Sequence, residues 1–118
     1  MSKLNISVIG LGFVGLPTAC ILANSKNKKN KKYFKVFGID KNLKSVSKNI
    51  ENINKKNGFS SDIKLNSLIK KTTKSDNFQL FDNFAPIKNS KIILVSVGFD
   101  FATGTKKQQF KKLANLFR

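Results

Sequence analysis

Residues 5–25 carry no charge, and the way this uncharged segment divides constrains the fold of the whole chain. The segment is a poor membrane-spanning helix, because three glycines and Pro17 interrupt its apolar residues. It is also a poor signal peptide, since Ala19–Ala23 does not resemble a cleavage site that follows a short apolar run. The segment therefore divides into a strand, a glycine-rich turn and an apolar helix, and we expect neither export nor a membrane anchor.

The predicted turn reads Gly10-Leu11-Gly12-Phe13-Val14-Gly15, which matches the G-x-G-x-x-G pattern. A predicted strand, Leu4–Ile9, precedes it, and a predicted helix from Phe13 or Val14 to about Asn24 follows it. In this context the first glycine permits a tight turn, the second lets the backbone approach a pyrophosphate, and the third allows the helix to pack closely on the strand. The free N–H groups at the helix start favour phosphate. A mononucleotide P-loop is excluded, because Gly15-Leu16-Pro17 lacks the required lysine.

An acidic residue follows the next predicted strand, Tyr33–Ile39, at the position where such a fold contacts a ribose. This residue, Asp40, lies 25 positions after Gly15, and the polar loop Ser25–Lys32 accounts for the extra length. A carboxylate there accepts hydrogen bonds from ribose hydroxyls and repels a 2′-phosphate, so we expect NAD to be preferred to NADP. The neighbouring Lys41 leaves NADP open as an alternative cofactor.

The rest of the chain continues the alternation of strands and helices. The predicted helices run from an Asn42 cap to about Asn54, where Asn57-Gly58 follows, from Ser61 or Asp62 onward, and from Thr105 to the end; the predicted strands are Asn77–Phe81 and Lys91–Val97. The second of these strands is an unbroken apolar run, typical of a strand buried on both faces of a parallel sheet. The order predicts a Rossmann-like, doubly wound parallel sheet in a three-layer α/β/α architecture.

The charge of the chain has two interpretations. The 23 Lys and Arg exceed the 6 Asp and Glu by 17, and 22 of the 23 are lysines spread along the sequence. Fourteen asparagines and eleven phenylalanines accompany them, so a bias toward A/T-rich codons is a sufficient cause. We interpret the lysines mainly as a solvated basic surface and predict no specific nucleic-acid binding, because base readout relies on arginine. An electrostatic role toward an anionic ligand is the alternative.

Several chemistries are excluded or unsupported. The chain has one cysteine, Cys20, and no histidine, which excludes an internal disulfide, a Cys/His zinc site and a histidine base. Cys20 lies on the apolar helix, where we expect buried packing, with a reactive thiol as the alternative. The spacing of Asp76, Asp82 and Asp100 identifies no carboxylate pair, and we predict no metal site. Gly98-Phe99-Asp100 follows a strand end and is either a ligand loop or a plain connection.

The residues Ser7–Ala19, followed by Val36–Asn42 and the helix end at Ile53-Asn54, resemble the N-terminal region of the UDP-glucose/GDP-mannose dehydrogenase family. The resemblance covers roughly residues 4–100. It implies an N-terminal NAD-binding Rossmann domain in a cytoplasmic enzyme that oxidises the C6 alcohol of a nucleotide sugar to a carboxylate in two hydride transfers, for polysaccharide biosynthesis. It also implies NAD contacts from Gly10, Leu11, Gly12, Phe13, Val14, Gly15, Asp40 and Lys41.

The chain also departs from that family. Val97-Gly98-Phe99-Asp100 replaces the family's Val-Pro-Thr-Pro-like or Val-Gly-Thr-Pro-like loop, and the family's Glu-Pro-Gly-containing stretch is absent after Asn54. The family's nucleophilic cysteine, its lysine and its nucleotide-sugar domains lie farther along than residue 118, and Cys20 cannot replace that cysteine.

We therefore expect residues 1–118 to be a partial NAD-binding domain without catalytic residues, inactive alone, with substrate binding and homo-oligomerisation confined to a full-length enzyme. The alternatives are a stand-alone dinucleotide-binding module or a basic domain that binds a polyanion without catalysis.

Overall fold

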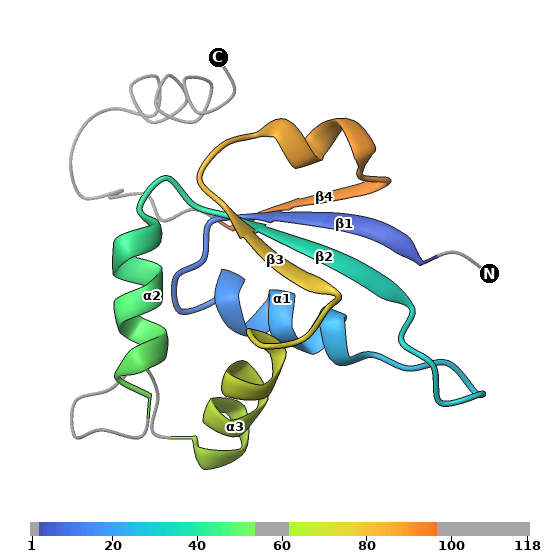
Figure 1. The fold of residues 1–118 in the computed structure, drawn as a ribbon, viewed down its shortest axis with the longest axis horizontal. Coiled ribbons are helices and arrows are strands. Elements are labelled where there is room, and N and C mark those ends of the chain that lie inside the picture. Colours follow the sequence, from blue (N-terminus) through green and yellow to red (C-terminus); the bar gives the residue numbers. More distant parts are fainter. Residues whose placement is uncertain (1–2, 54–61, 97–118) are drawn as a thin grey trace, which may run out of the picture.

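The computed structural model describes residues 3–53 and 62–96, which form one parallel sheet with its helices. In chain order the elements are β1 (Leu4–Ile9), α1 (Gly15–Asn24), β2 (Phe34–Ile39), α2 (Leu43–Glu51), α3 (Ile63–Thr72), β3 (Phe78–Phe81), the 3₁₀ helix η1 (Ala85–Asn89) and β4 (Ile92–Val95). The strand order is β3-β2-β1-β4, and every neighbouring pair is parallel (Figure 1).

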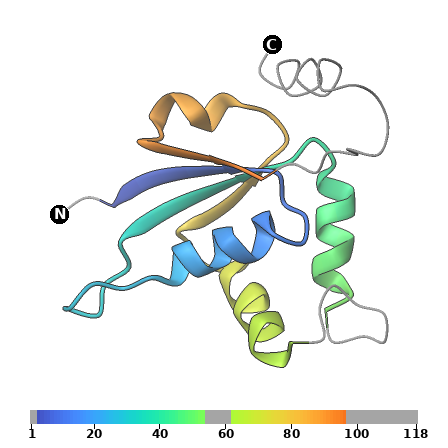
Figure 2. The ribbon, with the colours of Figure 1, turned by 180° about the vertical axis from the view of Figure 1, so that it is seen from behind.

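The three α-helices lie on one side of the sheet and η1 lies on the other, in both views of the ribbon (Figures 1 and 2). The chain builds outward from β1 through β2 to β3 and then returns to place β4 on the opposite side of β1. This order is that of the first half of a Rossmann fold, and it creates a switch point between β1 and β4 where ligands bind at the carboxyl ends of the strands. The predicted Rossmann-like α/β architecture is confirmed.

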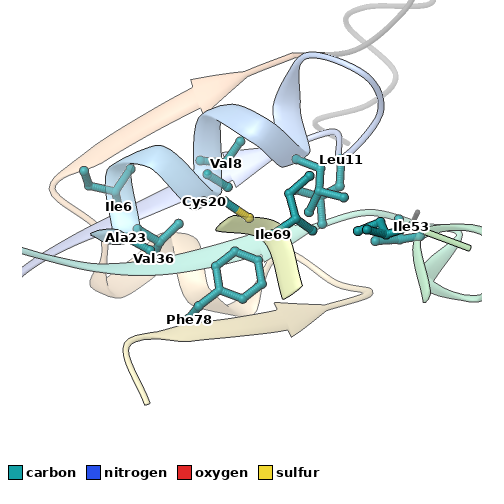
Figure 3. Close-up of a cluster of buried hydrophobic side chains, with 12 residues drawn as sticks. Ile6, Val8, Leu11, Cys20, Ala23, Val36, Ile53, Ile69 and Phe78 are labelled. Carbon is teal, nitrogen blue, oxygen red and sulfur yellow. The ribbon is translucent and has the colours of Figure 1, made fainter. Parts of the chain in front are cut away.

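The core lies between the sheet and the α-helices. The last four residues of both β1 and β2 are buried, because α1 packs across these two central strands. Its buried side chains are small or aliphatic, and α3 packs beside it through Ile69 (Figure 3). The cluster consists of Ile6, Val8, Leu11, Leu16, Ala19, Cys20, Ala23, Val36, Val46, Ile53, Ile69 and Phe78.

Side-chain caps explain where two helices begin. The Oδ1 atom of Asn42 accepts a hydrogen bond from the Ser45 amide, and Oδ1 of Asp62 accepts from the amides of Lys64 and Leu65. Such caps satisfy N–H groups that have no partner within the helix. The predictions of Asn42 and Asp62 as caps are confirmed. The other predicted cap, Ser61, the predicted stop at Asn57-Gly58 and the predicted helix from Thr105 lie outside the described residues.

Two expectations about the second half of the chain are wrong. The strand at residues 92–95 forms as predicted, but it is not buried on both faces: Ile92, Ile93, Leu94 and Val95 are 36–44% exposed. β4 pairs only with β1 among the described strands, so one of its edges lacks a described neighbour. The predicted order also places β4 directly after β3, whereas the 3₁₀ helix η1 connects them, with Pro86 buried in it.

Among the described residues, no helix has the length and apolar character needed to cross a membrane. This agrees with the division of the N-terminal segment into β1, a turn and the ten-residue α1.

The buried side chain of Asn77 ties α1 and β2 together where β3 begins. Its Nδ2 atom donates to the carbonyl oxygens of Ala23, at 2.6 Å, and Phe34, at 3.0 Å. The side chain is 3% exposed, so water cannot replace a lost donor there.

We expect Asn77→Ala to lower the free energy of unfolding by about 2 kcal/mol, because one buried and one part-buried carbonyl lose their donor. Urea denaturation followed by circular dichroism measures this loss. The matched control is Asn89→Ala, which truncates an exposed amide and should change stability by less than about 0.5 kcal/mol. Equal stability of the two variants would contradict the role of Asn77.

Candidate functional site

The glycine-rich turn between β1 and α1 has the geometry that its sequence predicts. Gly10 has a φ of 93°, a conformation that side chains strongly disfavour, and its amide donates to the Ile39 carbonyl at 2.8 Å. A Cβ atom on Gly15 would lie 1.6 Å from the Gly10 carbonyl oxygen. The third glycine therefore allows α1 to begin directly against the end of β1. A Cβ on Gly12, by contrast, would meet no atom within 4 Å.

The N-terminus of α1 is suited to an anion. Val14 is the N-cap residue and provides no side-chain hydrogen bond, and the first turn contains no acidic residue. The side chains of Phe13 and Val14 are 77% and 67% exposed, so they do not cover the helix start with buried packing. Because the first amides of a helix have no intrahelical acceptor and carry a partial positive charge, this end favours a phosphate group.

Asp40 lies at the end of β2 and links that strand to the glycine turn. Its Oδ2 atom accepts a hydrogen bond from the Leu11 amide at 2.9 Å, and its Oδ1 accepts from the Asn42 amide at 2.9 Å. A carboxylate offers about four acceptor positions, so both oxygens can still accept from a ligand hydroxyl. The side chain of Leu11 is buried against Gly38 of β2, which fixes the amide that holds Asp40.

A cavity of about 320 Å³ opens at the carboxyl ends of β1, β2 and β3. It brings together Gly10, Asp40 and Lys41 from the sequence-predicted set. The same cavity is lined by residues from the end of β3 that the sequence analysis did not assign to the site. The complete lining is Ile9, Gly10, Ile39, Asp40, Lys41, Asp82, Asn83 and Phe84.

The end of β3 could have been found from the sequence by the rule that parallel strands end at one edge. Asp82 was considered only for a paired carboxylate, whereas its position one residue after a predicted strand was the useful signal. Two hydrogen bonds order this turn: Asn83 Nδ2 donates to Asp82 Oδ1 at 3.1 Å, and the Ala85 amide donates to Asn83 Oδ1 at 3.0 Å.

The remaining predicted residues lie around the turn and outside the cavity lining. Gly12, Phe13 and Val14 lie in the turn just before α1. Gly15, the first residue of α1, lies beside Ser96 at the end of β4, since its added Cβ would be 3.4 Å from Ser96 Cβ. The glycine-rich turn thus reaches the switch point between β1 and β4. The Gly98-Phe99-Asp100 loop lies outside the described residues.

Cys20 is a buried core residue. Its side chain has no exposed surface, and burial raises the pKa of the thiol to about 12, with a hydrogen bond to Thr72 acting in the opposite direction. A thiol with so high a pKa is a poor nucleophile near neutral pH. Within residues 3–53 and 62–96, no group of three or more His, Cys, Asp or Glu residues could hold a metal ion.

Comparisons with known proteins agree with this geometry. A family model described as "UDP-glucose/GDP-mannose dehydrogenase family, NAD binding domain" matches residues 4–115. A search of curated proteins finds no match.

Solved structures are similar over most of the chain. An NDP-N-acetyl-D-galactosaminuronic acid dehydrogenase from Methanosarcina mazei Go1 is 28% identical with a TM-score of 0.64, over 86% of this chain and 21% of that one. A UDP-D-ManNAc dehydrogenase from Pyrococcus horikoshii is 26% identical with a TM-score of 0.56, over 80% and 20%. A GDP-mannose dehydrogenase from Pseudomonas aeruginosa, solved as a ternary complex, is 22% identical with a TM-score of 0.59, over 94% and 23%, and supports the fold alone. The chain thus spans about a fifth of each relative's length.

The two glycines of the turn should respond oppositely to the same substitution. We expect Gly15→Ala to destabilise the fold by about 3 kcal/mol, because its methyl group would collide with the Gly10 carbonyl. Gly12→Ala should leave the midpoint temperature of thermal unfolding unchanged or raise it slightly, since open space surrounds the new methyl group. Thermal unfolding of both variants measures the difference. A Gly15→Ala protein as stable as the Gly12→Ala protein would contradict the described turn.

The thiol of Cys20 should be unreactive until the chain unfolds. At pH 8 we expect its reaction with a chromogenic disulfide to be at least about a hundredfold slower in the folded protein than in urea, because burial suppresses both the thiolate and access to it. The absorbance of the coloured thiolate released from the reagent measures both rates. The Cys20→Ala variant gives the background rate of the reagent. Rapid modification without unfolding would instead indicate a reactive thiol.

Proposed function

From the premise that this chain belongs to the UDP-glucose/GDP-mannose dehydrogenase family, we propose that it binds NAD at the carboxyl edge of its sheet, as the cofactor-binding part of a nucleotide-sugar dehydrogenase. The observation that carries the proposal is the joining of the glycine turn to Asp40 by the bond from the Leu11 amide. In dinucleotide-binding folds, a glycine turn of this kind contacts the pyrophosphate and a carboxylate at this position contacts the ribose. The bond holds the two features side by side.

The cofactor's pyrophosphate would lie against the start of α1. Gly12 has open space where a side chain would stand, so the backbone leaves room for a close phosphate, and the amides of the first helical turn supply donors. Gly10 allows the tight turn, and Gly15 allows α1 to begin close to the end of β1. Together they let the helix start face the phosphate. The exposed side chains of Phe13 and Val14 flank the same helix end, and Leu11 contributes through its backbone.

The adenosine end would occupy the cavity of about 320 Å³. Asp40 would accept from the ribose hydroxyls with the acceptor positions that its two backbone partners leave free. Its negative charge disfavours a 2′-phosphate, whereas Lys41 in the same lining attracts one. We propose that the carboxylate dominates, because backbone amides hold it in place, whereas Lys41 is exposed and no hydrogen bond to the described residues holds its side chain.

Sugar oxidation is the part of the proposal that needs residues beyond this set. Bound NAD supplies the hydride acceptor, and the enzyme would oxidise the C6 alcohol of a nucleotide sugar to a carboxylate. We assign no catalytic residue within the chain, which spans about a fifth of the solved relatives. The proposal therefore treats residues 1–118 as a partial NAD-binding domain that is inactive alone, and it retains the cytoplasmic location, the link to polysaccharide biosynthesis and homo-oligomerisation of a full-length enzyme as expectations.

Isothermal titration of the purified chain with NAD tests the proposal. We expect wild-type protein to bind NAD and Gly12→Asp to show no binding while keeping its fold, because the new carboxylate would occupy the pyrophosphate position and repel it. Asp40→Asn should weaken NAD binding by about tenfold and narrow the preference for NAD over NADP, since the charged acceptor is lost. Circular dichroism checks that both variants fold.

The contrary outcome is clear. If the wild-type and Gly12→Asp proteins both fold and neither shows a heat of NAD binding, the proposal that this site binds NAD is wrong. If Asp40→Asn prefers NAD to NADP more strongly than the wild type does, the Asp40 carboxylate does not select NAD. That result would leave NAD binding itself unaffected.

A further inference from the structure

The loop that joins α1 to β2 gathers positive charge at the end of the molecule opposite the candidate NAD site. Residues 25–32, here named the lysine loop, contain five lysines in eight positions: Lys26, Lys28, Lys29, Lys31 and Lys32. The loop projects from the end of the sheet where β2 begins, while the glycine turn lies at the other end (Figures 1 and 2). Any ligand of the lysine loop would therefore not compete directly with a dinucleotide.

The lysine loop is a defined hairpin. Lys26 and Lys32 form an antiparallel bridge, and the Asn27 amide donates to the Lys31 carbonyl at 2.8 Å. Asn27 Oδ1 accepts from the amides of Lys29 and Lys31, at 2.9 and 3.0 Å. Asn30 takes the left-handed conformation, with φ 63°, that asparagine tolerates well. The backbone thus fixes where the lysine side chains start.

These charges have little compensation within the part of the chain that the structure describes. Lys26, Lys28, Lys29 and Lys31 are exposed, and no ion pair joins them to any carboxylate of the described residues. Lys32 differs, because its Nζ donates to Asn77 Oδ1 at 3.2 Å and so anchors the loop to the start of β3. Like charges held close together repel one another, and a polyanion would relieve that repulsion by replacing their counterions.

More lysines lie at the end of α3, which is joined to the end of α1 just before the loop. The Asn24 and Thr72 side chains are hydrogen-bonded, which brings the ends of α1 and α3 together. Lys70, Lys71 and Lys74 lie within two residues of Thr72, and the exposed Asp76 is the acidic residue of this turn. The helix dipole explains lysines in the last turn of α3. It does not explain the lysines of the loop, which lie beyond the end of α1.

An exposed aromatic residue follows the loop directly. Tyr33 is 46% exposed, and its ring lies beside that of Phe34, with 5.5 Å between the centroids. Its amide donates to the Ser25 carbonyl, so Tyr33 is attached to the base of the hairpin. Lysines beside an accessible ring are the combination with which proteins bind single strands, through phosphate contacts and base stacking.

We propose that the lysine loop and Tyr33 form a binding surface for single-stranded nucleic acid without sequence preference. Lysine supplies point charges to phosphates, and it lacks the planar fork with which arginine reads base edges, so the surface would not be sequence-specific. Duplexes would bind more weakly than single strands, because their bases are stacked internally and cannot reach the Tyr33 ring.

Fluorescence anisotropy with a labelled oligothymidylate of about 15 nucleotides, a length suited to one single-strand site, tests the proposal on the full chain. We expect K28Q/K29Q/K31Q to weaken binding at least tenfold and to reduce the salt slope by about 2, since each phosphate contact contributes about 0.7 on single strands. The matched control, K44Q/K48Q/K64Q, removes the same charge from exposed sites on α2 and α3 and should change affinity less than twofold.

Further measurements separate stacking and partner class. Tyr33→Leu should weaken oligothymidylate binding about fivefold or more while Tyr33→Phe retains it, because phenylalanine keeps the stacking ring. Equal losses in the two triple variants would overturn the proposal in favour of a general charge effect. Stronger loop-dependent binding to heparin or to anionic phosphatidylserine vesicles than to the oligonucleotide would overturn the nucleic-acid assignment. The test is independent of NAD binding, and saturating NAD should leave oligonucleotide affinity unchanged.

Discussion

The contact between Gly15 and the Gly10 carbonyl is the constraint on which the rest of the structure depends. It lets α1 start immediately after β1 and pack across β1 and β2, where its small buried side chains complete the core. The same contact points the uncapped helix start toward the carboxyl edge of the sheet. The packing of α1 and the position of its free N-terminal amides thus have one cause, and any side chain at Gly15 would destabilise the fold.

The parts of the site that were predictable are those that local sequence encodes. Gly10 and Gly15 lie in a motif whose spacing follows from backbone sterics. Asp40 directly follows the apolar residues with which β2 ends. Asp82, Asn83 and Phe84 were missed because they join Asp40 only through the β2–β3 pairing, in which Ile39 lies opposite Phe81. The end of each predicted strand is visible in the sequence, whereas the adjacency of β2 and β3 is a property of the sheet.

Burial was harder to predict than secondary structure. Lys91–Val97 has the composition of a central strand, and residues 92–95 do form a parallel strand, yet their side chains are exposed. The apolar pattern records what a strand prefers to contact, whereas exposure depends on which elements are next to it. A similar difference applies to Ile63, an apolar residue that is 74% exposed at the start of α3. By contrast, Val46 of α2 and Ile53, two residues after α2 ends, are buried in the core.

Among the described strands, the outer edge of β4 has no neighbour, and this edge makes the lysine excess relevant to aggregation. An edge strand with apolar side chains, no proline and no charge is a template on which other strands can add, and natural sheets usually protect such edges. The strand β4, Ile92–Val95, contains neither a charged residue nor a proline that would protect its edge. A net charge of +17 makes two copies of the chain repel one another before their edges can meet. Long-range repulsion would then replace local protection, and concentrated salt, by screening it, would expose the chain to edge-to-edge association.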